Sequence, residues 1–138
     1  MLAARPRSTQ RLLIVEHDGS MGTFATRVLR RAGFDTVHVS SGEDALGLLS
    51  GDGPWHGLLA AAQLPGMSGA ELTAVVREAH PNLPIAVVTG YLSAEQSGEL
   101  ERGGADVVLV RPLTPAGLVT EMRELLGAPR SRRTVDPA

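Results

Sequence analysis

Short runs of apolar residues alternate with amphipathic helical patterns along most of the chain. The runs have the length of buried β-strands and contain few polar residues; they cover residues 12–15, 36–39, 58–62, 85–88 and 107–110. The last two runs are rich in valine and isoleucine, which favour strands. Between the runs, apolar residues recur every three or four positions, as one face of a helix requires. The first such set is Met21, Phe24, Ala25, Val28, Leu29 and Ala32.

Start and stop signals flank these helical patterns. Ser20 is a candidate N-cap for the first helix, and Gly33 is a candidate stop for it. Ser68 has a glutamate three residues later, which is the spacing of a capping box. Ser93 precedes a fourth helix with little apolar surface. Thr114, followed by proline at the first helical position, predicts the start of the last helix.

The order of these patterns predicts five βα units in sequence. Strands that are apolar throughout are typical of a parallel sheet with helices on both faces. We therefore expect one doubly wound α/β domain with a five-stranded parallel sheet over residues 11–127. Residues 1–10 and 128–138 are expected to be disordered tails, because they are short and polar.

Composition narrows the class of protein. The chain is 43% hydrophobic and 20% charged with a net charge of -2, which is typical of a soluble globular domain and gives no basic excess for nucleic acid. It has no cysteine, which fits a reducing compartment. Neither a signal peptide nor a membrane-spanning run is visible. We expect a cytoplasmic protein with no nucleic-acid or membrane partner.

In doubly wound folds the functional groups lie at the carboxyl ends of the strands. The loops to consider therefore begin at Glu16, Ala61, Thr89 and Arg111. They contain neither a glycine-rich phosphate loop nor a nucleophile with a histidine partner. The four histidines fall in separate elements without the spacing of a metal site. We expect no metal, no cofactor and no enzymatic activity.

The same loops and their flanks resemble the receiver domains of response regulators in bacterial two-component signalling. The resemblance runs from residue 11 to residue 126, and the segments that carry it are 31–34, 41–46, 64–72, 83–90, 104–106 and 111–114. Each segment is a weak signal alone, but the ordered set is specific. The resemblance implies a flavodoxin-like sandwich with strand order 2-1-3-4-5, which agrees with the strand pattern.

The resemblance also implies a set of phosphorylation-site positions. In the family, two acids after the first strand and an aspartate ending the third strand hold magnesium, and that aspartate accepts the phosphoryl group. A hydroxyl residue after strand four and a lysine after strand five contact the phosphoryl oxygens. These positions fall on Glu16 and His17, Ala61, Thr89 and Arg111. The family's aromatic switch position falls on Val108.

Thr89 is the only unmodified match among these positions, although Glu16 is still an acid. The methyl group of Ala61 can neither attack a phosphoryl donor nor ligate a cation, and magnesium requires hard oxygen ligands. A usual receiver site has a formal charge of about -2, whereas Glu16 with Arg111 sums to about zero, since histidine is largely neutral at neutral pH. We expect Arg111 to form a salt bridge with Glu16. A one-residue shift of the alignment would make Asp18 the second acid and could restore weak cation binding.

Two surfaces are candidates for partner contact. Met21 and Phe24 lie at the start of the first helix, where phosphotransfer partners dock in this family, although both also lie on its apolar face. Tyr91 and Val108 belong to the family's other usual contact face.

We interpret the chain as a phosphorylation-independent receiver-like module that acts by protein–protein contact. The resemblance implies a histidine kinase, a phosphotransfer protein or another signalling protein as its partner, with a homodimer as a further option. Two alternatives stay open: a phosphorylatable receiver that uses a displaced acid, and a flavodoxin-like domain that binds a small anion near Arg111.

Overall fold

Strands and helices alternate along the chain in the computed structural model, which describes residues 9–51, 53–90, 94–127 and 133–135. The strands are β1 (Arg11–Val15), β2 (Asp35–Val39), β3 (Gly57–Ala61), β4 (Ile85–Thr89), β5 (Val107–Val110) and β6 (Arg133–Val135). The helices are α1 (Gly19–Arg31), α2 (Gly42–Leu49), α3 (Gly69–Ala79), α4 (Ala94–Arg102) and α5 (Pro115–Gly127). In the described residues, no helix is both long and apolar enough to cross a membrane.

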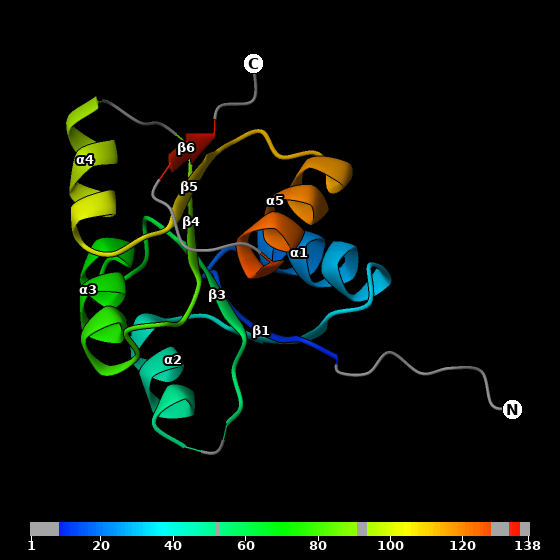
Figure 1. The fold of residues 1–138 in the computed structure, drawn as a ribbon, viewed down its shortest axis with the longest axis horizontal. Helices are drawn as coiled ribbons and strands as arrows, with labels where there is room; N and C mark the ends of the chain where they lie inside the picture. Colours follow the sequence, from blue (N-terminus) through cyan, green and yellow to red (C-terminus); the bar gives the residue numbers. More distant parts are fainter. Residues whose placement is uncertain (1–8, 52, 91–93, 128–132, 136–138) are drawn as a thin grey trace, which may run out of the picture.

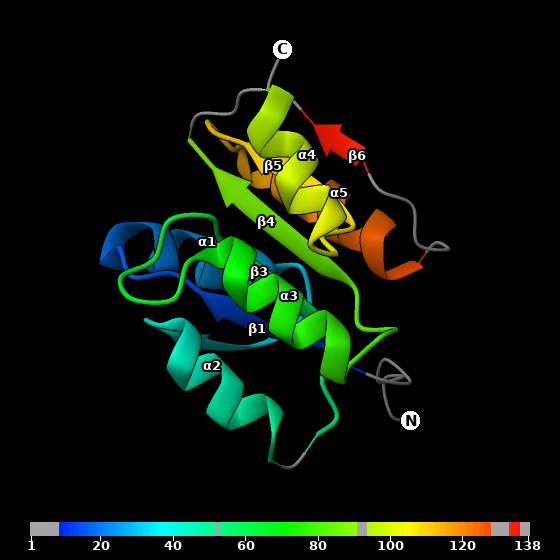
Figure 2. The same cartoon turned by 90° about the vertical axis from the view of Figure 1, so that its left-hand side faces the viewer.

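All strands of the sheet run parallel, in the order β2-β1-β3-β4-β5-β6. The predicted order 2-1-3-4-5 is therefore confirmed. Helices α1 and α5 cover one face of the sheet, and α2, α3 and α4 cover the other (Figures 1 and 2). This three-layer arrangement is the flavodoxin-like sandwich that the sequence predicted.

A sixth strand extends the sheet beyond the five that were expected. Residues 133–135 lie in the segment that we expected to be a disordered tail, and they pair in parallel with Val107–Leu109 of β5. The unpaired N–H and C=O groups of an edge strand can bind any segment that reaches them, which explains why a short polar stretch becomes a strand here. The rest of both expected tails, apart from residues 9 and 10, lies outside the described residues.

Each face of the sheet has its own hydrophobic core. Because side chains alternate along a strand, neighbouring residues of β1, β3, β4 and β5 enter opposite cores. The α2–α4 side contains Leu13, Val15, Leu58, Ala60, Leu72, Val76, Ile85, Val87 and Val108, and the α1–α5 side contains Leu12, Ile14, Leu29, Leu59, Val88, Leu109, Leu118 and Met122. Every residue of β3 and β4 is buried, as expected for central strands of a parallel sheet.

Most of the predicted helix boundaries have the expected cause. Ser68 and Glu71 form the capping box that begins α3, with bonds of 2.9 and 3.1 Å. The Thr114 hydroxyl accepts a 2.9 Å bond from the amide of Gly117 at the start of α5. Gly33 follows α1 with a φ of 102°, which glycine adopts readily. The predicted cap Ser93 lies outside the described residues.

Candidate functional site at the carboxyl edge of the sheet

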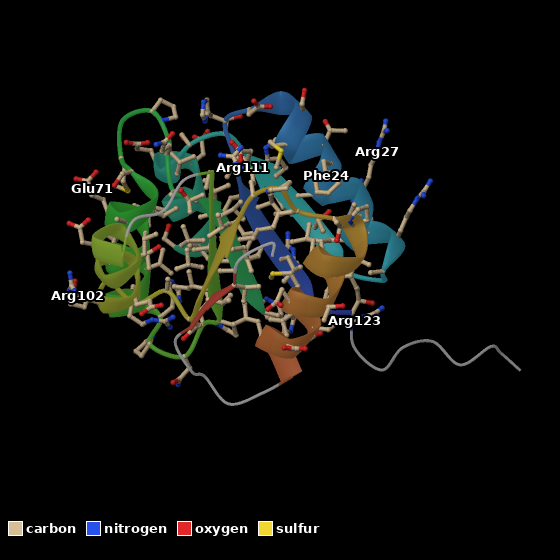
Figure 3. The ribbon with its side chains drawn as sticks, turned by 90° about the horizontal axis from the view of Figure 1, so that it is seen from above. Phe24, Arg27, Glu71, Arg102, Arg111 and Arg123 are labelled. Atoms are coloured by element: carbon tan, nitrogen blue, oxygen red, sulfur yellow. The ribbon has the colours of Figure 1, made fainter. Side chains whose placement is uncertain are left out.

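Four neighbouring strands bring the predicted site positions to one edge of the sheet. Glu16 follows β1, Ala61 ends β3, Thr89 ends β4 and Arg111 follows β5. The register places the strand ends side by side through the pairs Val15↔Ala60, Ala61↔Val88 and Thr89↔Val110. Figure 3 shows Arg111 in the middle of this edge, between the two helical layers.

Glu16 is held mainly by contacts within its own loop. The residue is 9% exposed, and its amide donates a 3.0 Å bond to the carbonyl of Val39. Its carboxylate accepts a 3.1 Å bond from the amide of Asp18 and lies 3.6 Å from Nδ1 of His17, whose side chain is half-exposed. These contacts come from the loop after β1, so the carboxylate is held close to its own backbone.

His38 belongs to this site although the sequence analysis did not assign it there. Its Nε2 lies 2.8 Å from the carbonyl oxygen of Glu16. The parallel pairing of β1 with β2, which aligns Ile14 with His38, brings the imidazole to this position. Nothing in the sequence spacing of 22 residues signals the contact.

Ala61 occupies the end of β3 and is 6% exposed. A small cavity of about 20 Å³ lies beside it, enough for one water molecule at most. Apart from Glu16, the lining of this cavity is apolar and includes Met21, Phe24, Val88 and Leu113. The end of β3 therefore presents a methyl group in an apolar setting.

Arg111 does not form the salt bridge with Glu16 that the sequence analysis predicted. Its amide donates a 2.8 Å bond to the carbonyl of Thr89, and its guanidinium packs over the backbone of Gly90. The Nε of Arg111 is buried and has no hydrogen-bond partner among the described residues. The prediction fails because the carboxylate of Glu16 is turned toward its own loop.

Asp18, rather than Ser20, is the N-cap of α1. Its backbone is extended, and Oδ1 accepts bonds of 2.9 and 3.1 Å from the amides of Ser20 and Met21. Both residue types form good caps, but the helix begins at Gly19, which leaves Ser20 inside its first turn. The Asp18 carboxylate, which a one-residue shift of the alignment would make the second acid, is thus engaged in capping.

Replacing Asp18 by alanine is expected to lower the free energy of unfolding by about 1 kcal/mol, because two amides of the first turn lose their acceptor. Chemical denaturation measures this loss. Asp18→Ser, which keeps an acceptor oxygen, should recover most of the stability. An Asp18→Ala variant as stable as the parent would contradict the capping role.

The candidate contact residues differ in their exposure. Val108 is fully buried in the core on the α2–α4 side, so its assignment to a partner surface is wrong. Met21 and Phe24 are both half-buried and line the cavity beside Ala61, and Phe24 also lines a larger groove between α1 and α5. Tyr91 lies outside the described residues. Of the three described residues, Phe24 is the one that lines the larger groove.

The residues at this edge do not fit a magnesium ion. Nowhere in the described part of the chain do three histidine, cysteine or acidic residues gather in a way that could hold a metal. The two carboxylates nearest the edge, Glu16 and Asp18, accept backbone hydrogen bonds. Magnesium needs several oxygen ligands in a near-octahedral array, which this edge does not supply.

Comparison with known proteins places these observations in a family context. Residues 12–123 match the family model "Response regulator receiver domain". The chain is 29% identical over 117 residues to the response regulator receiver protein CpdR of Brucella abortus, covering 85% of this chain and 97% of that protein. It is 34% identical to the DNA-binding response regulator MtrA of Mycobacterium tuberculosis, again over 85% of this chain but only 50% of that protein.

Solved structures show the same fold. A putative response regulator from Chloroflexus aurantiacus is 29% identical and superposes with a TM-score of 0.82, over 88% of this chain and all of that one. The chemotaxis response regulator CheY4 of Vibrio cholerae is 24% identical with a TM-score of 0.81, over 86% of this chain and all of that one.

Proposed function

The chain belongs to the response regulator receiver domain family of two-component signalling, and we propose that it acts there without being phosphorylated, through contact with other proteins. The observation that carries the proposal is the methyl group of Ala61 at the carboxyl end of β3. Phosphorylation of a side chain needs a nucleophilic atom at the position the donor can reach. Alanine has none.

The charges around Ala61 support the same proposal. Glu16 and Arg111 contribute opposite formal charges, which sum to about zero, so little attraction remains for a divalent cation or for the charge of a transferred phosphoryl group. The Glu16 carboxylate is held by its own loop, and the Arg111 guanidinium packs over the backbone of Gly90. In this proposal neither side chain is placed to take part in phosphoryl transfer. In this proposal the domain is not an enzyme.

Partners in this proposal are signalling proteins, such as a histidine kinase or a phosphotransfer protein, met in the cytoplasm. The relatives differ in what accompanies the receiver domain. The match covers nearly all of CpdR but about half of MtrA, so the family presents such domains both alone and attached to further chain. The proposal concerns the receiver domain itself.

Titration with magnesium and beryllofluoride, followed by amide NMR, tests the absence of phosphorylation. Beryllofluoride mimics a phosphoryl group when it binds an aspartate carboxylate. Because Ala61 has no carboxylate, we expect no saturable shifts of the amide signals. Saturable shifts at Glu16, Thr89 and Arg111 would sink the proposal, because they would require an acceptor carboxylate at this edge.

A rebuilt site provides the positive control. The triple variant His17→Asp, Ala61→Asp and Arg111→Lys restores the family's residue types beside Glu16 and Thr89. It is expected to bind magnesium and beryllofluoride where the parent does not, since the carboxylates return and an ammonium replaces the guanidinium. Thermal melting should first establish that the variant is folded. A folded variant that stays inert would show that the loss extends beyond these positions.

A further inference from the structure

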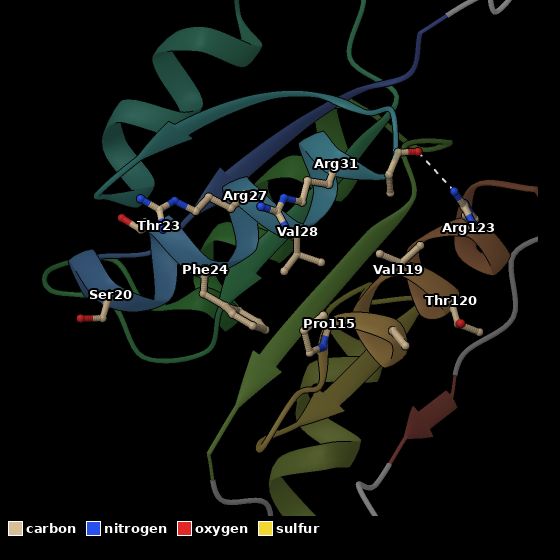
Figure 4. A pocket seen from close by; sticks show the side chains of 12 residues that line it. Ser20, Thr23, Phe24, Arg27, Val28, Arg31, Pro115, Val119, Thr120 and Arg123 are labelled. Atoms are coloured by element: carbon tan, nitrogen blue, oxygen red, sulfur yellow. Dashed lines mark hydrogen bonds between the residues drawn. The ribbon is translucent and has the colours of Figure 1, made fainter.

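A groove lies on the surface between α1 and α5, lined by residues from Ser20 to Ala32 and from Pro115 to Arg123. It has a volume of about 790 Å³. Figure 4 shows Phe24 and Val28 of α1 pointing across the groove toward Pro115 and Val119 of α5. Phe24, Val28 and Val119 are half-buried, so the floor of the groove is apolar but still accessible to a partner.

Arginines line the sides of this apolar floor. Arg27 and Arg31 are exposed and lie one helical turn apart on α1, and in the described part of the chain neither has a hydrogen-bond or ion-pair partner. Arg123 of α5 donates a 3.2 Å bond to the carbonyl of Ala32 and thereby ties the end of α1 to α5 (Figure 4). No acidic residue is among the twelve that line the groove.

The lining of the groove is more positive than the chain as a whole. The whole chain has a net charge of -2, and α1 contains arginines but no acid. On the opposite layer, α2 begins with Glu43 and Asp44 and has no basic residue. A long apolar groove lined by three arginines on an otherwise acidic protein selects an occupant that is both apolar and acidic.

We propose that the α1–α5 groove binds an acidic amphipathic helix of a partner protein. Each of the two helices has 13 residues, which at about 1.5 Å per residue gives a groove about 20 Å long, the length of three to four helical turns. The floor accommodates apolar residues spaced three or four apart. Arg27 and Arg31 pair with acidic residues that have the same four-residue spacing on the partner helix.

This inference depends on the proposed function only in that the domain works by contacting another protein. It names the chemistry of that partner and the face of the domain that receives it. None of Glu16, His17, Ala61, Thr89 and Arg111 lines the groove, although Phe24 lines both the groove and the cavity beside Ala61. Its test is therefore independent of beryllofluoride binding.

A designed peptide is the probe. It is a fluorescein-labelled helix of about four turns, with leucines at three- and four-residue spacing and glutamates on both flanks. Its two controls are the same peptide with lysine for glutamate and a scrambled peptide of the same composition. Fluorescence anisotropy should show saturable binding of the glutamate peptide and of neither control peptide. Amide NMR shifts on binding should map to α1 and α5.

Charge reversal on the groove provides the decisive comparison. The double variant Arg27→Glu and Arg31→Glu is expected to weaken binding of the glutamate peptide by about tenfold or more, because attraction becomes repulsion at two positions. The matched control is Arg102→Glu, an exposed arginine on α4 in the opposite layer, which should leave the affinity within about twofold. Val28→Ser should weaken binding through the floor without altering charge.

Several results would overturn the proposal. These are no saturable binding of the glutamate peptide, unchanged affinity in the double variant, or equal loss in the Arg102 variant. Sedimentation that shows a dimer of the parent protein, lost in the double variant, would instead assign the groove to a second copy of this chain. Beryllofluoride binding by the parent would defeat the proposed function and leave the peptide measurements unaffected.

Discussion

Replacing Arg77 by alanine is expected to lower the free energy of unfolding by about 3–5 kcal/mol, because it leaves a buried carboxylate without its cation. Nη2 of Arg77 lies 2.9 Å from Oδ2 of Asp106, and the Asp106 residue is 1% exposed. The same guanidinium donates to the carbonyl oxygens of Gly104, at 2.6 Å, and Leu83, at 2.7 Å. A single side chain thus joins the end of α3 to the entries of β4 and β5.

Urea denaturation followed by circular dichroism would measure the loss. Arg102→Ala is the matched control, since Arg102 is an exposed arginine on a neighbouring helix and its removal should change stability by less than about 0.5 kcal/mol. Asp106→Ala should cost a similar amount to Arg77→Ala, since it also removes the acceptor for the amide of Ile85, bonded at 2.9 Å. A loss below about 1 kcal/mol in both variants would contradict this account.

Replacing Gly69 by alanine is expected to cost about 3 kcal/mol and to disturb the carboxyl edge of the sheet. Gly69 begins α3, and a Cβ there would overlap the carbonyl oxygen of Ala61 and lie 2.7 Å from the Cα of Ala62. These are backbone atoms, which cannot turn aside as the end of a side chain can. The clash must displace either the start of α3 or the end of β3.

Gly47→Ala is the matched control for this second prediction. Gly47 is a helical glycine in α2 that is exposed, and nothing lies within 4 Å of the place a Cβ would occupy. Alanine there should stabilise the protein by about 0.5–1 kcal/mol, because it reduces the freedom of the unfolded chain. Thermal melts of both variants give the comparison. A Gly69→Ala variant as stable as the parent would show that the β3–α3 loop moves freely.

The local sequence pattern was sufficient to predict where the strands and helices lie. It failed to predict the helix cap where two residues of similar capping propensity stood close together. The apolar runs located all five predicted strands to within one or two residues, because each run is bounded by polar or turn-forming residues. Ser20 and Asp18 are both good caps, and only the extended backbone at Asp18 determines which of them acts. The strand at residues 133–135 has no periodicity of its own and exists because β5 offers an unpaired edge.

The types of side chain at the carboxyl edge are a property of the sequence alone. Residue type alone gives Ala61 a methyl group, His17 an imidazole and Arg111 a guanidinium, and the alternation of strands with helices is enough to bring these positions to one edge. Tertiary structure decided which groups contact each other: Glu16 faces its own loop, Arg111 lies over Gly90, and Val108 is buried. It also brought Phe24, Val28 and the arginines of α1 and α5 together along one groove. Such contacts depend on the direction of each side chain and on the packing of segments about 90 residues apart, as for Arg123 and Ala32, and no local pattern encodes them.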